Sequence, residues 1–224
     1  MTIRMGELLA NHNNDFRVEP TRKRIRAVLD GRVVLDSRRA LLVWPPSSPV
    51  PTYAVPVEDI LLPAQVLQSQ NALPSPADDE LAGMVVLRFS NFDAWLEDDD
   101  QILGHPRDPF HRVDVRATSQ RIKLSLDGQV LADTVRGRLL YETGLPTRYY
   151  VPRADILVPL LPTRTHTICP YKGEASYWSF TLGGDAYTDQ LWSYERPLAD
   201  SGVPAGYVAF YDERFELTVH PPID

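Results

Sequence analysis

The chain has 224 residues, 43% of them hydrophobic and 24% charged, which is the composition of a globular protein. Its formal net charge of −7 disfavours unaided binding to nucleic acid, since such binding depends on clustered lysines and arginines. No apolar run reaches the roughly 20 residues that span a bilayer, and the start "MTIRMGELLANHNNDF" lacks the apolar core of a signal peptide. We therefore expect a cytoplasmic protein that binds neither nucleic acid nor membrane.

After an N-terminal extension (residues 1–16), the first predicted element is a β-hairpin over residues 24–37, "RIRAVLDGRVVLDS". Asp30 and Gly31 at its centre favour a tight turn, because glycine accepts a positive φ. The stretch "YAVPVEDIL" (53–61) follows, and then "PAQVLQSQ" (63–70), which we expect to form a short helix. The segment "HPRDPF" (105–110) is typical of a linker between domains.

The second half of the chain repeats the first. "RIKLSLDGQVLADT" (121–134) matches the hairpin at an offset of 97 with seven of fourteen positions identical, and "YYVPRADIL" (149–157) matches at an offset of 96 with six of nine identical. This pattern indicates a tandem duplication. With 20 prolines and 12 glycines between short β-rich runs, we predict an all-β fold of two tandem domains, residues 17–104 and 111–224, joined by the linker at 105–110.

The two copies differ between the repeated "DIL" and their last strands. Trp95 and Phe210 each lie ten residues before a His-Pro pair, and on that alignment the first copy is 19 residues shorter. The first copy also has no counterpart of "CPYKG" (169–173). We therefore expect the functional site in the second copy.

Cys169 is the only cysteine of the chain, which excludes an intrachain disulfide and a metal site of four thiolates. The five histidines lack the spacing of metal ligands, so we expect neither a metal nor a cofactor. Cys169 is either a small packed side chain beside a proline or a thiolate nucleophile helped by His166 or Lys172. His166 lies three residues earlier, a spacing that puts the two side chains on opposite faces of an extended strand.

Lys172 and Glu142 are the other candidate catalytic residues. Lys172 is either a solvated loop lysine or a group that binds an anion or a carbonyl inside a pocket. Glu142 and Arg148 bracket the turn "TGLPT", and the simplest interpretation is an ion pair that ties the ends of the turn together. A carboxylate held by a buried arginine could instead act as a general base.

The remaining candidates are ligand-binding residues that cluster in the same copy. Each aromatic residue alone is typical of a β-sheet core, but together "SYW" and "WSY" could wall an apolar pocket with Lys172 and Glu142 at its rim. The predicted ligand-binding residues are Arg148, Tyr150, His166, Tyr171, Tyr177, Trp178, Trp192 and Tyr194.

Five stretches, "RIKLSLDGQVLADT", "LLYETGLPTRYYVPRADI", "CPYKGEASYW", "WSYERPL" and "YVAFYDERFELTV", resemble the domain of unknown function 427 family in a tandem form common in actinobacteria. The resemblance extends from about residue 17 to residue 220. It implies a β-tent fold, in which two small antiparallel sheets meet at an angle with a pocket near the opening. Many β-tent proteins hold zinc with two CxxC pairs, which this chain lacks. It also lacks the phosphate loop and paired aspartates of a nucleotidyltransferase.

Three hypotheses about function remain open. The first is a protein that binds a small molecule in one aromatic-lined pocket of the second domain, the first domain being a structural copy. The second is an enzyme that uses Cys169 or Lys172 in covalent or acid–base chemistry on a small substrate. The third is a module that binds protein partners through exposed aromatic surfaces.

Overall fold

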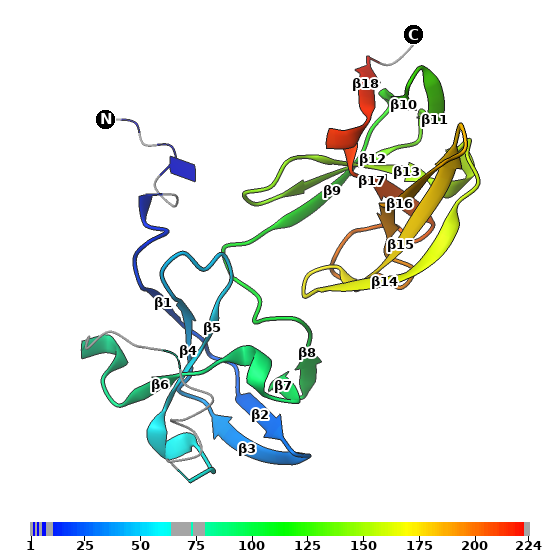
Figure 1. Cartoon of the computed structure of the whole chain (residues 1–224). Helices are drawn as coiled ribbons and strands as arrows, with labels where there is room; N and C mark the ends of the chain where they lie inside the picture. Colours follow the sequence, from blue (N-terminus) through cyan, green and yellow to red (C-terminus); the bar gives the residue numbers. More distant parts are fainter. Residues whose placement is uncertain are drawn as a thin grey trace. The chain divides into compact units, whose positions relative to one another are not determined.

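The computed structural model describes residues 2, 4, 6–7, 11–63, 73 and 79–221, and these form an all-β protein of several small antiparallel sheets (Figure 1). The chain divides into two compact units, Met1–Asp108 and Pro109–Asp224. Apart from Pro63, the predicted helix at 63–70 lies outside the described residues. Among those residues, no helix has the length and apolar character needed to cross a membrane.

The described residues of the first unit form two four-stranded sheets, with strand orders β1-β4-β5-β6 and β3-β2-β7-β8. Its described strands are β1 (Arg17–Pro20), β2 (Ile25–Leu29), β3 (Arg32–Ser37), β4 (Leu41–Trp44), β5 (Thr52–Pro56), β6 (Met84–Val86), β7 (Ala94–Glu97) and β8 (Asp100–Ile102). Short 3₁₀ helices are η1 (Val57–Asp59), η2 (Asp79–Leu81) and η3 (Phe89–Asn91).

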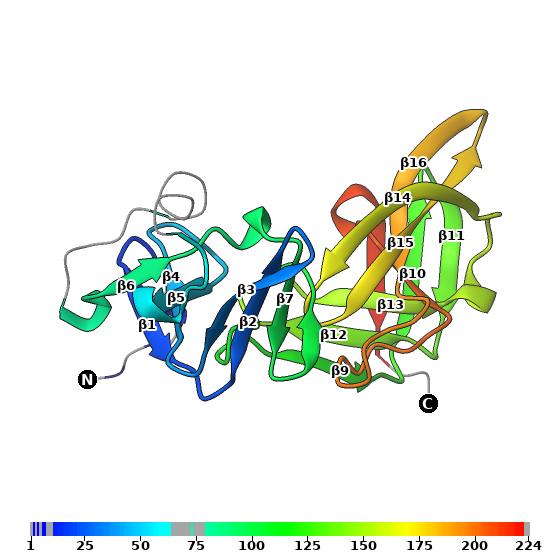
Figure 2. The same ribbon diagram turned by 90° about the horizontal axis from the view of Figure 1, so that it is seen from below.

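The second unit contains a seven-stranded sheet, β14-β15-β16-β17-β13-β12-β9, and a three-stranded sheet, β11-β10-β18 (Figure 2). Its strands are β9 (Val113–Ala117), β10 (Arg121–Leu126), β11 (Gln129–Thr134), β12 (Arg138–Glu142), β13 (Arg148–Pro152), β14 (Leu161–Cys169), β15 (Gly173–Leu182), β16 (Asp185–Ser193), β17 (Tyr207–Phe210) and β18 (Glu216–His220). Two 3₁₀ helices, η4 (Arg153–Asp155) and η5 (Asp212–Arg214), follow β13 and β17.

The two predicted hairpins are confirmed, as β2–β3 and β10–β11. Asp30 and Gly31 have φ values of 50° and 69°, and Asp127 and Gly128 have values of 49° and 78°. Two consecutive residues with positive φ are the requirement of the tight turn that matches the twist of the flanking strands. The Asp-Gly pair therefore determines each hairpin locally.

Each hairpin is tied to the following 3₁₀ helix by the same polar contacts. In the first unit Ser37 Oγ donates to Asp59 (2.7 Å), and in the second Thr134 Oγ1 donates to Asp155 (2.6 Å). The arginine two residues after each hydroxyl pairs with the same carboxylate. A β-bulge also lies at the same point of β2 and β10. The two units therefore share backbone and side-chain detail at aligned positions.

The alignment of Trp95 with Phe210 is wrong. Trp95 in β7 lies opposite Ala27, whereas Leu217 in β18 lies opposite Leu124, the aligned partner of Ala27. Counted from the repeated "DIL" to Trp95 and to Leu217, the first unit is shorter by 26 residues rather than 19. The His-Pro pairs misled the alignment because the first unit adds the strand β8 before its pair. The additional chain of the second unit includes β14 and β16.

The seven-stranded sheet has two different faces. One face packs against the three-stranded sheet through a core of buried residues: Ile122, Leu124, Leu131, Val151, Phe180, Leu191, Val208 and Phe210. The other face has a separate cluster: Leu140, Tyr150, Ala175, Tyr194, Val203 and Ala209. Since neighbouring residues of a strand point to opposite faces, this division decides which of the predicted site residues can act together.

Candidate functional site

Most of the predicted aromatic residues share the second face of the seven-stranded sheet. Tyr177 lies opposite Trp192 in the ladder between β15 and β16, and Trp192 and Tyr150 both lie opposite Ala209 of β17. Directly opposed residues project to the same side of a sheet. We call five of the aromatic residues on this side the aromatic face; they are Tyr150, Tyr177, Trp192, Tyr194 and Tyr211.

The aromatic face has a buried base and a half-buried surface. Tyr150 and Tyr194 are 1% and 5% exposed, and loss of hydration raises the pKa of both phenols. Trp192 Nε1 donates to the Tyr150 hydroxyl (3.2 Å), and its ring lies 4.7 Å from that of Tyr211. Tyr177, Trp192 and Tyr211 are only partly buried. Three connected rings are thus available to a ligand.

A cluster of His111, Glu142 and Lys172, here called the Glu142 cluster, lies on the same side of the sheet. The Lys172 ammonium pairs with Glu142 Oε2, and His111 Nε2 lies 3.0 Å from Glu142 Oε1. The Glu142 side chain is 7% exposed and that of Lys172 12%. Burying an ion pair this deeply costs desolvation energy. A buried charged group of this kind is a candidate functional site.

The Lys172–Glu142 contact requires a curved sheet. Lys172 lies in the turn between β14 and β15, whereas Glu142 ends β12, and three strands separate β15 from β12. At about 4.8 Å per strand, a flat sheet would hold the two segments roughly 19 Å apart. The sheet therefore curves toward the aromatic face, so that the β14–β15 turn contacts the end of β12 across the three strands between them.

The turn that carries Lys172 is held in place by its neighbours. The Leu198 amide donates to the Lys172 carbonyl (3.1 Å), and the Tyr171 ring stacks on His111 with centroids 4.4 Å apart. Gly173 has a φ of 104°, and a Cβ there would lie 3.4 Å from the Arg196 carbonyl oxygen. Only glycine fits this backbone without strain. The backbone of this turn therefore determines where the Lys172 ammonium lies.

Cys169 and His166 do not form a catalytic pair. Cys169 is partly buried and packs against the cluster around Tyr150. His166 lies opposite Ser176, one residue out of phase with the aromatic face, and its Nδ1 lies 3.0 Å from Glu174 Oε1 at the surface. The alternation of side chains along β14 separates the thiol from the imidazole, as the three-residue spacing predicted.

The predicted Glu142–Arg148 ion pair is wrong. Arg148 pairs instead with Asp212 and, at 2.6 Å, with Glu213, while its guanidinium lies 5.7 Å from the Trp192 ring centroid. The hydrogen bond from Arg148 lowers the pKa of Glu213 to about 2. Glu142 and Arg148, at the two ends of the turn after β12, therefore belong to different ion-pair networks. Arg148 borders the aromatic face and is already neutralised by two carboxylates.

Trp178 does not wall the same surface as Trp192, in contrast to the predicted pocket. It lies opposite Leu191 and packs in the core between the two sheets of the unit. Its Nε1 donates to Ser193 Oγ (2.8 Å), and the Arg153 guanidinium lies 4.3 Å from its ring centroid. The two tryptophans are on opposite faces because Trp178 is adjacent to Tyr177 in β15.

Two members of the site were missed from the sequence. His111 lies just after the predicted linker, 31 residues before Glu142, and no local spacing connects the two. Tyr211, just after β17, is not among the ligand-binding residues predicted from the sequence. Within the part of the chain that the structure describes, no group of three or more His, Cys, Asp or Glu side chains is placed to hold a metal ion. The Glu142 cluster pairs one carboxylate with an ammonium and an imidazole.

The comparisons with known proteins bear on this second unit alone. Residues 114–220, from β9 to the end of β18, match the family model described as a domain of unknown function (DUF427). The curated proteins contain no match to the chain.

Proposed function

We propose that this chain, whose residues 114–220 form a domain of the DUF427 family, uses that domain to bind a small molecule on its aromatic face. The observation that carries the proposal is the continuous half-buried surface of Tyr177, Trp192 and Tyr211 beside the buried Glu142–Lys172 pair. Aromatic walls with a few converging polar groups are the usual composition of a small-molecule site.

The polar edge of the aromatic face suits a flat ligand with hydrogen-bonding groups at its rim. Thr167 Oγ1 lies 3.2 Å from the Tyr177 hydroxyl. Burial, followed by a hydrogen bond with Tyr177, raises the pKa of Tyr211 to about 12. The Tyr211 phenol is therefore neutral at pH 7 and can donate as well as accept a hydrogen bond. A planar molecule stacked on Trp192 would find these hydroxyls at its edge.

Tryptophan fluorescence tests this proposal with a matched control. Trp192→Phe should abolish the fluorescence response to a ligand found in a broad screen and weaken its binding about tenfold, since base- or ring-stacking contacts contribute about 1–3 kcal/mol. Trp178→Phe, on the opposite face, should leave the affinity within about twofold. Equal effects of the two substitutions would contradict the proposal.

A second candidate function is acid–base catalysis, favoured by the position of Glu142 between an ammonium and an imidazole. Such a carboxylate can pass a proton to or from a bound substrate while Lys172 balances its charge. If the ligand is turned over, Glu142→Gln should lower kcat by about 10²-fold or more and change KM little. Unchanged turnover in this variant would contradict a catalytic role of Glu142, and ligand binding would remain as the proposed function.

We also propose that the two units arose by duplication. Their aligned hairpins share a turn, a bulge and the hydroxyl–carboxylate–arginine contacts to the next 3₁₀ helix. This origin is supported because a stable hairpin does not require all of these details, so two unrelated sequences would not be expected to share them.

A further inference from the structure

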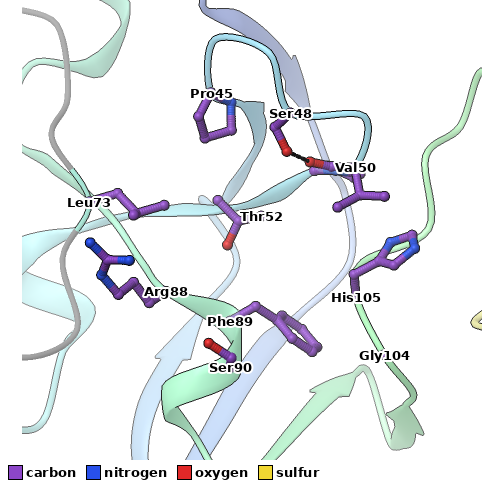
Figure 3. Close-up of a pocket in the computed structure, with 11 residues that line it drawn as sticks. Pro45, Ser48, Val50, Thr52, Leu73, Arg88, Phe89, Ser90, Gly104 and His105 are labelled. Atoms are coloured by element: carbon purple, nitrogen blue, oxygen red, sulfur yellow. Dashed lines mark hydrogen bonds between the residues drawn. The ribbon is translucent and has the colours of Figure 1, made fainter. Parts of the chain in front are cut away.

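The first unit contains an open depression of about 280 Å³ between the β4–β5 loop and the segment after β6 (Figure 3). Pro45 and Val50 form one wall, Arg88 and Phe89 the other, and His105 lies on the side away from Arg88. A cavity of this size holds a molecule with a single ring.

The charge of the depression differs from that of the whole chain. The described residues that line it include Arg88 and His105 but no carboxylate, although the chain has a net charge of −7. The exposed Arg88 side chain makes no hydrogen bond or ion pair with any described residue. A free guanidinium over an apolar surface is a ready partner for a carboxylate, which it can bind with two parallel hydrogen bonds.

In the second unit, the Arg148 side chain takes the place that corresponds to this depression. Val43 lies opposite Thr52 in the first unit, and at the same ladder position Leu140 lies opposite Arg148 in the second. Thr52 is short, and its hydroxyl is bonded to the Leu87 carbonyl (2.6 Å). The replacement of a long side chain by threonine therefore leaves the space open in the first unit.

The charges around this space are also reversed between the units. η3 and η5 follow β6 and β17 at equivalent positions, so that Phe89 stands where the second unit has Asp212. In the second unit a cation fills the space and Asp212 and Glu213 bind it from the wall. In the first unit the cation, Arg88, is on the wall. The missing complement is an anion.

Ring stacking and a hydrogen bond support the two walls of the depression. The Phe89 ring stacks on that of Trp95, with centroids 5.1 Å apart and planes 10° apart. The loop on the other side is fixed by a hydrogen bond from Arg17 Nη2 to the Ser48 carbonyl (2.9 Å). Ser47 in that loop has a φ of 62°, a conformation that costs energy for a residue other than glycine. A preformed site loses little entropy when a ligand binds.

We infer that the first unit binds a small organic carboxylate, whose ring packs on Phe89 and whose carboxylate pairs with Arg88. This site is separate from the aromatic face of the second unit. It gives the shorter unit a binding role of its own.

Benzoate and its neutral isostere benzamide test the inference by amide chemical shifts of the full-length protein. Benzoate should cause saturable shifts at Phe89, Ser90 and His105 with a Kd of about 1 mM, and benzamide should bind at least about tenfold more weakly, because a charge-assisted hydrogen bond is lost. Arg88→Gln should remove the preference for benzoate, and Arg88→Lys should restore part of it. Arg32→Gln, which removes the same charge from the exposed start of β3, should change neither Kd.

Three results would overturn the inference. The first is equal binding of benzoate and benzamide by the unaltered protein. The second is an Arg88→Gln variant that keeps the spectrum of the folded protein and binds benzoate as Arg32→Gln does. The third is a set of shifts confined to the second unit.

Discussion

Cys169 lies partly buried against the aromatic face, three residues before a lysine whose ammonium is already paired with Glu142. The thiol therefore lacks two of the groups that commonly activate a cysteine, a free cation and an adjacent imidazole. His111 is engaged by Glu142, and His166 projects to the other face. At the scale of single residues, the surroundings favour packing over nucleophilic chemistry for this side chain.

The alkylation rate of Cys169 checks this interpretation directly, because the chain has only one thiol. Iodoacetamide should modify the folded protein at least about tenfold more slowly than the urea-unfolded chain at the same pH, since packing limits access to the sulfur. Comparable or faster modification of the folded protein would indicate an activated thiolate and would favour covalent chemistry.

At the scale of elements, each hairpin is stabilised by its contact with the next 3₁₀ helix. Asp155 accepts hydrogen bonds from Arg136 and Thr134. Both bonds lower the pKa of its carboxyl group, and the bond from Arg136 has the larger effect. Thr134 is 3% exposed, so its hydroxyl depends on this acceptor. The carboxylate thus links the end of β11 to η4.

Asp155→Asn should lower the free energy of unfolding by about 1 kcal/mol near pH 7. Because the folded-state pKa lies below the unfolded value of 3.8, the carboxylate contributes fully above about pH 4 and loses its contribution as the pH falls through the folded value. The difference between the two proteins should therefore shrink below pH 4 in urea titrations. Asp185→Asn, at the exposed β15–β16 turn, is the control for removal of a charge, and a difference that stays constant down to pH 2 would contradict the assignment.

At the scale of the whole molecule, the two units share the details of their hairpins but carry different candidate sites. The second unit uses its additional strands to curve over the aromatic face and to deliver Lys172 to Glu142. The first unit lacks that extension and has an open depression where the second unit has Arg148. Arg88→Gln and Trp192→Phe should therefore act on separate ligands, each without effect on the other binding event.

The sequence alone predicted the features that depend on neighbouring residues. The all-β class followed from short alternating runs, and both hairpins followed from Asp-Gly pairs whose backbone preference is local. The separation of His166 from Cys169 followed from the two-residue period of a strand. The placement of the site in the second unit, argued from "CPYKG" having no counterpart in the first, stays a prediction.

Tertiary structure alone decided which distant side chains meet. The curvature of the seven-stranded sheet brings Lys172 to Glu142 across three strands, and the chain after residue 109 brings His111 to the same carboxylate. Strand register placed Trp178 on the opposite face from Trp192 and gave Arg148 two carboxylates more than sixty residues away. Contacts of this kind depend on register and sheet curvature summed over many residues, and no local pattern in the sequence encodes them.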